Sequence, residues 1–369
     1  MIDRFAPSLG IGEIPSFDEV MHRINSDNTV SEGLARAALL EVLNMDHETC
    51  RAAKLGSLLM GTVKIATPEL VTGFVKAVGD FDGRDFVKDR ITVDGIDGPV
   101  VGCAGSGKKG TKTVNITTPA MVVAAAAGAN VVKSGSRSTS SLTGSTDVLE
   151  LSGFKIPEDN EVSNYILKEL GFGFYSIEGM IPRFDRIYGN HFYAPHTLSY
   201  VLPAALTPVK VDTMMYGFSG SKVSLSSSAL VRLGFTSNLV YSNTNDGVHY
   251  IDEIASTGTS MVCGARDGEV GETLSIDAAD YFDIRDQAKP GIKALTTAEE
   301  HASAFQSVLN GEFKGSEAEN TVCLNAGSIL YLCGVTLGPK DGFALAQETI
   351  RSGASKQKLD DIVAMSNDL

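Results

Sequence analysis

Residues 103–119, with the sequence CAGSGKKGTKTVNITTP, combine three glycines, three lysines and a run of hydroxyl side chains just before an alanine-rich stretch. Glycines allow a backbone to approach a ligand closely, and a helix that follows adds the positive end of its dipole. This pattern predicts a site for a ligand that carries phosphate. It is neither a Walker A motif nor a GxGxxG fingerprint with an acidic residue placed for a ribose hydroxyl.

Residues 131–150, VVKSGSRSTSSLTGSTDVLE, form a second polar loop that is rich in serine and threonine. Hydroxyl groups both donate and accept hydrogen bonds, which suits a polyanion joined to a sugar. No acidic residue occurs in residues 105–137, although the whole chain has a net charge of −14. This local excess of positive charge favours a small anionic ligand. The alternatives are a solvated basic loop and a flexible surface loop.

Asp252 and Glu253 are adjacent carboxylates in the segment NDGVHYIDEI (245–254). Bringing two carboxylates together is costly unless a cation lies between them or water screens them. Mg²⁺ is typically held by one or two carboxylates together with substrate phosphates. The pair is therefore a candidate magnesium site, although adjacent acids are also common on solvated surfaces.

The elements expected to position these residues change in type along the chain. Residues 16–80 have apolar residues at helical spacing and Thr67-Pro68 as a helix start. Strand, loop, helix and strand then follow at 98–105, 103–119, 115–129 and 130–133, which predicts a parallel sheet with a crossover helix. Ligands bind such sheets at the carboxyl ends of the strands. Further strands are expected at 209–217, 237–243 and 258–265, residues 154–188 are expected to be helical and then irregular, and two helices are expected near the C-terminal end.

Composition limits the classes of protein that remain. The chain has 369 residues, of which 43% are hydrophobic, and this length favours two domains. We expect a cytoplasmic protein, because the sequence shows neither an apolar signal core nor a membrane-spanning run. The five cysteines are scattered, which argues against disulfides and a zinc site. The net charge of −14 argues against nucleic-acid binding.

Together, the three polar segments resemble those of the anthranilate phosphoribosyltransferase family, whose fold is similar to that of pyrimidine nucleoside phosphorylases. GSGKKGTKTVNITT (105–118) resembles the family's GTGGDGxxTFNIST without a gap. KSGSRSTSSLTGSTDVLE (133–150) resembles KHGNRxxSSxSGxxDVLE, and Asp252-Glu253 resembles the end of DGxDE. The resemblance extends over about residues 16–358.

The resemblance implies an α/β fold with a small all-helical domain and a larger α/β domain that has a mostly parallel central sheet. The helical domain would span residues 1–75 and be completed by about 155–190. The α/β domain would comprise 76–154 and 191–369. The resemblance also implies phosphoribosyl pyrophosphate as the donor, Mg²⁺ as the cofactor and a homodimer formed through the helical domains.

The resemblance further implies roles for individual residues. Donor-binding positions are Gly105, Thr113, Asn115, Ile116, Thr117, Thr118, Lys133, Ser141 and Ser145. Positions that hold magnesium are Thr117, Asp252 and Glu253. Further substrate-binding candidates are Lys108, Lys109, Ser134, Ser136, Arg137 and His196. We expect no protein nucleophile, because the reaction needs only an acceptor held in line with the sugar carbon and a stabilised pyrophosphate.

Two departures from the family motifs bear on the acceptor. Lys108-Lys109 replace Gly-Asp, and Ser134 and Ser136 replace the family's His and Asn, of which the Asn contacts anthranilate. The lysines would either strengthen pyrophosphate binding or bind an acceptor that has an extra carboxylate or phosphate. The sequence leaves both roles open.

A third departure lies at the position where the family has an arginine that contacts the anthranilate carboxylate. Asn190 falls at its position, although Arg183 or Arg186 could substitute through a shifted loop. We therefore expect an aromatic or heterocyclic acceptor other than anthranilate. His191 and His196 are candidates for a base that takes the acceptor's proton.

Two other functions fit parts of the pattern. A nucleoside phosphorylase would use the TGxTD pattern of residues 143–147, with the nearby lysines binding inorganic phosphate. A non-catalytic nucleotide-binding homologue would not need the metal carboxylates, and their presence argues against it.

Overall fold

The computed structural model describes residues 14–137, 144–189, 191–284 and 287–369. None of the described helices is both long and apolar enough to cross a membrane. The first helices are α1 (Ser16–Asn25), α2 (Glu32–Leu43), α3 (Glu48–Gly61) and α4 (Pro68–Asp82). Those in the middle of the chain are α5 (Thr117–Ala126), α6 (Ser145–Leu151), α7 (Asn160–Leu170), α8 (Pro182–Tyr188), the 3-10 helix η1 (Thr197–Tyr200), α9 (Leu202–Ala205) and α10 (Val223–Arg232). The last are α11 (Ala278–Tyr281), α12 (Ala298–Leu309), α13 (Glu317–Leu332), α14 (Pro339–Arg351) and α15 (Ala354–Asp368).

The strands form one mixed sheet. They are β1 (Val100–Gly105), β2 (Asn130–Gly135), β3 (Phe172–Ser176), β4 (Thr213–Gly217), β5 (Asn238–Thr244), β6 (Tyr250–Ile251), β7 (Thr259–Arg266), β8 (Glu269–Val270) and β9 (Leu274–Asp277). The main order is β3-β2-β1-β4-β5-β7-β8, with β6 beside β5 and β9 beside β7. Neighbours from β3 to β5 are parallel, and the later strands are antiparallel. The strand order therefore reverses between β1 and β4, the kind of position at which parallel sheets bind ligands.

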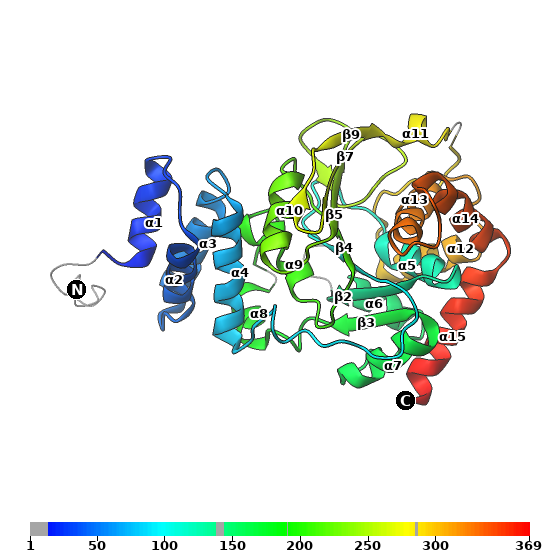
Figure 1. The fold of residues 1–369 in the computed structure, drawn as a ribbon, viewed down its shortest axis with the longest axis horizontal. Helices are drawn as coiled ribbons and strands as arrows, with labels where there is room; N and C mark the ends of the chain where they lie inside the picture. Colours follow the sequence, from blue (N-terminus) through cyan, green and yellow to red (C-terminus); the bar gives the residue numbers. More distant parts are fainter. Residues whose placement is uncertain (1–13, 138–143, 190, 285–286) are drawn as a thin grey trace.

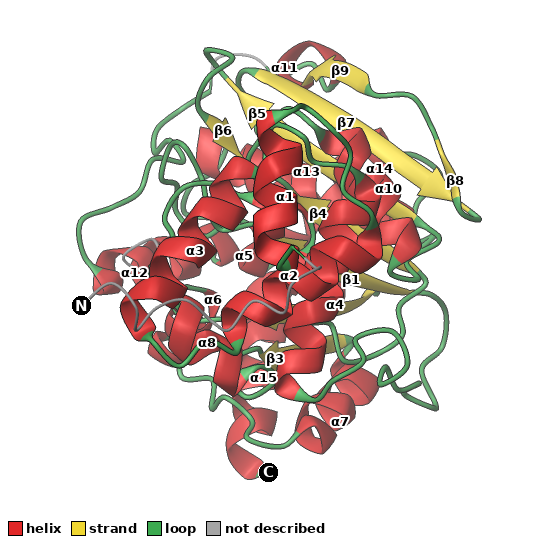
Figure 2. Ribbon diagram, turned by 90° about the vertical axis from the view of Figure 1, so that its left-hand side faces the viewer, coloured by secondary structure: helices red, strands yellow, loops and turns green. Residues whose placement is uncertain are grey.

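The sheet separates the two larger of three buried apolar clusters, because alternate residues of a strand face opposite sides. Cys103, Met215 and Tyr241 face the side that is covered by α5 and by α12 to α15. Met214 and Tyr216 face the other side, together with α1 to α4, η1, α9 and α10. Figure 1 shows the two helical layers on either side of the sheet, and Figure 2 shows α1 to α4 in front of it. The sequence prediction of a helical part and a larger α/β part with a mostly parallel sheet is confirmed.

Two features of the structure bear on the expected division of the chain into domains, which stays a prediction. α4 starts at Pro68 with a Thr67 side-chain cap, as predicted, but runs to Asp82, so residue 75 lies inside a helix. The segment 155–190 divides between two sides of the molecule: β3 pairs with β2, α7 packs on β3 and α15, and α8 packs on α4. The physical reason is that FGFYS (172–176) is a short apolar run that is buried as a strand of the sheet.

Candidate active site

A cavity of about 390 Å³ opens at the carboxyl ends of the parallel strands. β1 and β2 lie side by side, with Cys103 opposite Lys133, so the two polar loops that follow them meet at one edge of the sheet. The loop after β1 leads into α5, and Asn115, Ile116 and Thr117 bring the start of this helix to the cavity wall. The sequence prediction that both loops flank one site is confirmed by this geometry.

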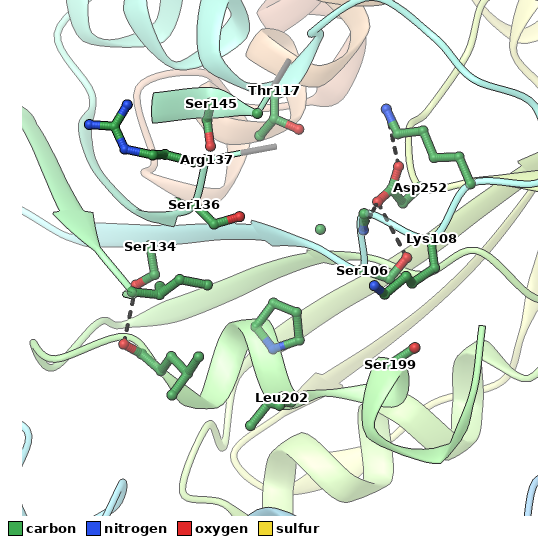
Figure 3. Close-up of a pocket in the computed structure, with 18 of the residues that line it drawn as sticks. Ser106, Lys108, Thr117, Ser134, Ser136, Arg137, Ser145, Ser199, Leu202 and Asp252 are labelled. Atoms are coloured by element: carbon green, nitrogen blue, oxygen red, sulfur yellow. Dashed lines mark hydrogen bonds and ion pairs between the residues drawn. The ribbon is translucent and has the colours of Figure 1, made fainter. Parts of the chain in front are cut away.

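Asp252 lies against the loop that follows β1. Its Oδ2 accepts a hydrogen bond from the Gly107 N–H at 2.8 Å and one from Ser106 Oγ at 3.3 Å. A Cβ atom at Gly105 would lie 2.9 Å from that same Oδ2, and one at Gly217 would lie 2.1 Å from the Asp252 carbonyl oxygen. Glycine suits both strand ends, because a side chain at residue 105 would displace the carboxylate and one at residue 217 would clash with the main chain of Asp252. Figure 3 shows Asp252 beside Ser106 at one end of the cavity.

Lys109 contacts both adjacent carboxylates. Its Nζ lies 2.9 Å from Glu253 Oε1 and 3.2 Å from Asp252 Oδ1, and it donates to Thr113 Oγ1 at 2.6 Å. Burial acts to lower the pKa of Lys109, but the two carboxylates outweigh it and raise the pKa above its usual range. The side chain is therefore a buried ammonium ion that neutralises part of the charge of the pair.

The side chains of two other lysines at the cavity form no hydrogen bond or ion pair with a described residue. Lys133, on β2, is buried, and burial lowers its pKa. Lys112 Nζ is also buried and has no hydrogen-bond partner among the described residues, and burial likewise lowers the pKa of Lys112. A buried ammonium without a partner is unfavourable. The cavity is therefore prepared for an anion that would complete the hydrogen bonds of both lysines.

The loop that follows β2 contributes hydroxyl groups to the opposite end of the cavity. Ser136 and Ser145 line it, and Ser134 Oγ is turned to the Leu206 carbonyl oxygen and to Thr207 Oγ1, both at 3.3 Å. Arg137 also lines the cavity, but its guanidinium forms two hydrogen bonds with Glu150 of α6. Figure 3 shows Ser134 and Arg137 across the cavity from Asp252 and Lys108.

Lys108 points away from the carboxylates that Lys109 contacts. Its ammonium donates to the Phe192 carbonyl oxygen and lies 5.5 Å from the centre of the Tyr188 ring. Burial lowers the pKa of Lys108 to about 8, and Lys112 adds to the effect. Consecutive lysines thus serve different parts of the cavity. Lys108 faces a wall that is formed by Tyr188, Ser199 and Leu202.

His196 lies behind that wall and does not line the cavity. Its Nδ1 accepts the Leu198 N–H at 3.3 Å, which places its proton on Nε2, 2.7 Å from the Tyr188 hydroxyl. Burial, with a contribution from Lys108, lowers the pKa of His196 to about 3, so the ring is neutral. In this geometry His196 contacts Tyr188 and does not reach the cavity, so a role in binding substrate or as a base stays a prediction.

The remaining predicted residues divide as follows. The cavity is lined by the predicted residues Gly105, Lys108, Lys109, Thr113, Asn115, Ile116, Thr117, Lys133, Ser134, Ser136, Arg137, Ser145, Asp252 and Glu253. Thr118 is fully buried, and its N–H donates to Asn115 Oδ1 at 3.1 Å, so it belongs to the helix start and not to the cavity wall. Ser141 and Asn190 lie outside the described residues. His191 is exposed, and Arg183 anchors α8 to Phe81 and Asp82 of α4.

Several residues that form the site were not predicted. Ser219 donates its N–H to Ser106 Oγ at 3.1 Å, and Gly217 makes room for Asp252. Glu178 and Asp185 line the cavity near Tyr188. A glycine at the end of a predicted strand is a weak signal that could have drawn attention to Gly217. The acidic residues came from a stretch that was expected to be irregular.

The carboxylate oxygens of Asp252 and Glu253 are ligands of the kind that a hard divalent cation prefers. Asp252 Oδ1 is buried and makes an ion pair, not a hydrogen bond, and Thr117 Oγ1 lies 3.3 Å from Glu253 Oε2. Within the described ranges, no group of three or more His, Cys, Asp or Glu side chains could hold a metal. A metal at the pair would therefore take further oxygen ligands from water or from a bound substrate.

Comparisons with known proteins agree with this geometry. Residues 97–356 match the model of the glycosyl transferase family, a/b domain. The anthranilate phosphoribosyltransferase of Pyrobaculum aerophilum is 33% identical over 312 residues, which cover 84% of this chain and 87% of that protein.

Solved structures of two proteins of the same name share the fold. The structure from Thermus thermophilus has a TM-score of 0.71 at 23% identity and covers 96% of this chain and 100% of its own. The structure from Saccharomyces cerevisiae, in complex with PRPP and Mg, has a TM-score of 0.74 at 18% identity and covers 97% of this chain and 99% of its own. The relatives' names give no support to the expectation of an acceptor other than anthranilate. The chain belongs to the anthranilate phosphoribosyltransferase family, whose members are glycosyltransferase enzymes.

Proposed function

We propose that this protein transfers the phosphoribosyl group of phosphoribosyl pyrophosphate to an aromatic or heterocyclic acceptor that carries a carboxylate, with Mg²⁺ as cofactor. The observation that carries the proposal is the meeting of two phosphate-type loops and the Asp252–Glu253 pair around one cavity. The relatives' names make anthranilate the first acceptor to assay. The protein is expected to be cytoplasmic.

The residues of this chain suggest how the donor is held. The start of α5, with Asn115 and Thr117, presents N–H groups and hydroxyls to the diphosphate. Lys112 and Lys133 supply positive charge where the pyrophosphate leaves. Mg²⁺ held by Asp252 and Glu253 would neutralise charge on the diphosphate oxygens. The serines after β2 are placed to hydrogen-bond the ribose and its phosphate.

The transfer breaks the bond between ribose C1 and the diphosphate oxygen and forms a bond between C1 and the acceptor. The pyrophosphate takes the electron pair of the broken bond, and the acceptor loses a proton. The wall formed by Tyr188 and Leu202 suits an aromatic ring, and Lys108 suits its carboxylate. The chain then contributes by positioning and by electrostatic stabilisation, without a covalent intermediate.

Calorimetric titration of phosphoribosyl pyrophosphate, with and without Mg²⁺, tests the part of the proposal that concerns donor binding. We expect Mg²⁺-dependent binding that the double variant Asp252→Asn/Glu253→Gln loses. Asp246→Asn is the matched control, because Asp246 lies in the same loop but its carboxylate faces His249 and solvent. Binding of ribose 1-phosphate or a nucleoside in place of the donor would overturn the proposal in favour of a phosphorylase.

Loss of anthranilate fluorescence in the presence of donor and Mg²⁺ tests the acceptor. If the protein leaves anthranilate unchanged but transfers phosphoribose to a related aromatic acid, the proposal of a transferase stands and the identity of the acceptor changes. Failure with every aromatic acid would overturn the acceptor class.

We also propose a homodimer formed through α1 to α4. Met60, on α3, is 48% exposed on this helical layer, and such a side chain suits an apolar interface. Light scattering should then give twice the chain mass of 39.0 kDa. Met60→Glu should shift the protein toward the monomer, whereas a wild-type monomer would contradict the proposal.

A further inference from the structure

We propose that Lys109 is a built-in competitor for the divalent cation: its ammonium occupies the space between Asp252 and Glu253, and the metal binds the pair only by displacing it. The inference rests on the proposed function only in taking the two carboxylates as the metal ligands. It concerns a residue at which this chain has lysine where the family motif has aspartate.

The contacts of Lys109 already satisfy a cation. Its Nζ donates hydrogen bonds to Glu253 Oε1 at 2.9 Å and to Thr113 Oγ1 at 2.6 Å, and it forms an ion pair with Asp252 Oδ1 at 3.2 Å. The Lys109 side chain is 15% exposed and the two acidic side chains are 3% exposed, so water screens the ion pairs little. The pair thus has a fixed positive partner in the ligand-free protein.

A metal and this ammonium do not fit together at the same oxygens. Mg²⁺ binds oxygen at about 2.0–2.1 Å, so an ion that touches both carboxylates would lie next to Nζ in a site of low dielectric constant. The repulsion between the two cations would have to be relieved by movement of the lysine. Its flexible four-carbon side chain allows this movement without a change in the backbone.

Once displaced, the Lys109 ammonium needs another anion to contact. The loop beside it contains further lysines and does not supply that anion. Lys112 and Lys133 lie at the same cavity, and their side chains form no hydrogen bond or ion pair with a described residue. A diphosphate would accept hydrogen bonds from Lys109 and supply oxygens to the metal. Metal and diphosphate should therefore bind together, each raising the affinity of the other by the same factor.

Electron paramagnetic resonance of Mn²⁺, without donor or acceptor, measures the competition directly. We expect weak Mn²⁺ binding by the wild-type protein and at least about tenfold tighter binding by Lys109→Met, because the variant removes a like charge from the site. Lys112→Met is the control, since it removes the same charge from the same loop without a contact to the carboxylates. Equal Mn²⁺ affinity of Lys109→Met and wild type, or an equal gain in Lys112→Met, would overturn the proposal.

A second measurement covers the case in which Lys109→Met is poorly folded, because removing Lys109 leaves two buried carboxylates without their cation. We expect Lys109→Gln, which keeps a hydrogen-bond donor, to melt below wild type without metal and to regain the difference when Mg²⁺ is added. The wild-type melting temperature should respond less to Mg²⁺. A variant whose melting temperature is no more sensitive to Mg²⁺ than that of wild type would overturn the inference. Neither readout involves transfer, so failure of the proposed function would show separately, in donor and acceptor assays.

Discussion

Asn325, on α13, holds the main chain of Ile254 with both ends of its side-chain amide. Its Oδ1 accepts the Ile254 N–H at 3.3 Å and its Nδ2 donates to the Ile254 carbonyl at 3.0 Å. Asn325 is fully buried. Since Ile254 directly follows Glu253, a helix on the far side of the sheet fixes the carboxylate pair.

We expect Asn325→Ala to lower the free energy of unfolding by about 1–3 kcal/mol, because two buried backbone groups lose their partners. The donor should also bind more weakly, since the pair is no longer held. Urea denaturation and calorimetry measure the two effects. Ser328→Ala is the control, because the Ser328 hydroxyl bonds only within its own helix, to the Leu324 carbonyl. Donor affinity equal to that of wild type in Asn325→Ala would contradict this role.

Gly217→Ala should abolish donor binding and destabilise the protein. The added Cβ would lie 2.1 Å from the Asp252 carbonyl oxygen, which is a backbone atom that cannot turn aside. Gly56→Ala is the control, since a Cβ there has no neighbour within 4 Å. That helical substitution should stabilise the protein by about 0.5–1 kcal/mol. A Gly217→Ala protein with normal Mg²⁺-dependent donor binding would show that the close approach is not needed.

Lys133→Met should have opposite effects on stability and on ligand binding. The ligand-free protein should melt at a higher temperature, because an ammonium without a hydrogen bond or ion pair no longer has to be buried. Affinity for inorganic pyrophosphate should fall by about tenfold or more, because a charge-assisted hydrogen bond is lost. Thermal melts with and without pyrophosphate test both effects. A lower melting temperature without ligand would mean that Lys133 has a stabilising partner.

Binding of an acceptor carboxylate should weaken as the pH rises through about 8. Burial lowers the pKa of Lys108 to about 8, so the ammonium that would meet the carboxylate is lost in this range. The acceptor KM should rise between about pH 7 and 9, whereas Lys108→Arg stays charged and should remove this dependence. The same KM profile in both proteins would assign the carboxylate to another residue.

His196 should make stability, but not the transfer rate, sensitive to acid. Burial lowers its pKa to about 3 from the usual 6.5, so the unfolded chain binds more protons between these values. Stability therefore falls as the pH decreases through this window, by up to about 1.4 kcal/mol per pH unit from this group. His196→Phe should flatten the slope. A rate profile with an inflection near the usual histidine pKa that disappears in this variant would restore His196 as a base.

The polar loops and the parallel strands before them were predictable because each is a local pattern. The glycines and hydroxyls of 105–118 mark a strand end and a helix start within a few residues, and β1, α5 and β2 follow within residues 100–135 as expected. Strand β3 was missed because its five residues lie in a stretch that starts as a helix, and β6 because two residues give no periodic signal.

The sequence by itself determined the residue types of the site: lysines and hydroxyls for an anion, and Asp252 with Glu253 for a cation. Tertiary structure decided which of these groups meet. Lys108 and Lys109 are adjacent in the chain, yet one contacts the Phe192 carbonyl and the other the carboxylate pair. His196 is a titratable residue whose burial behind Tyr188 keeps it neutral. Contacts between distant segments depend on how the sheet brings its strand ends together, and no local pattern of residues records that arrangement.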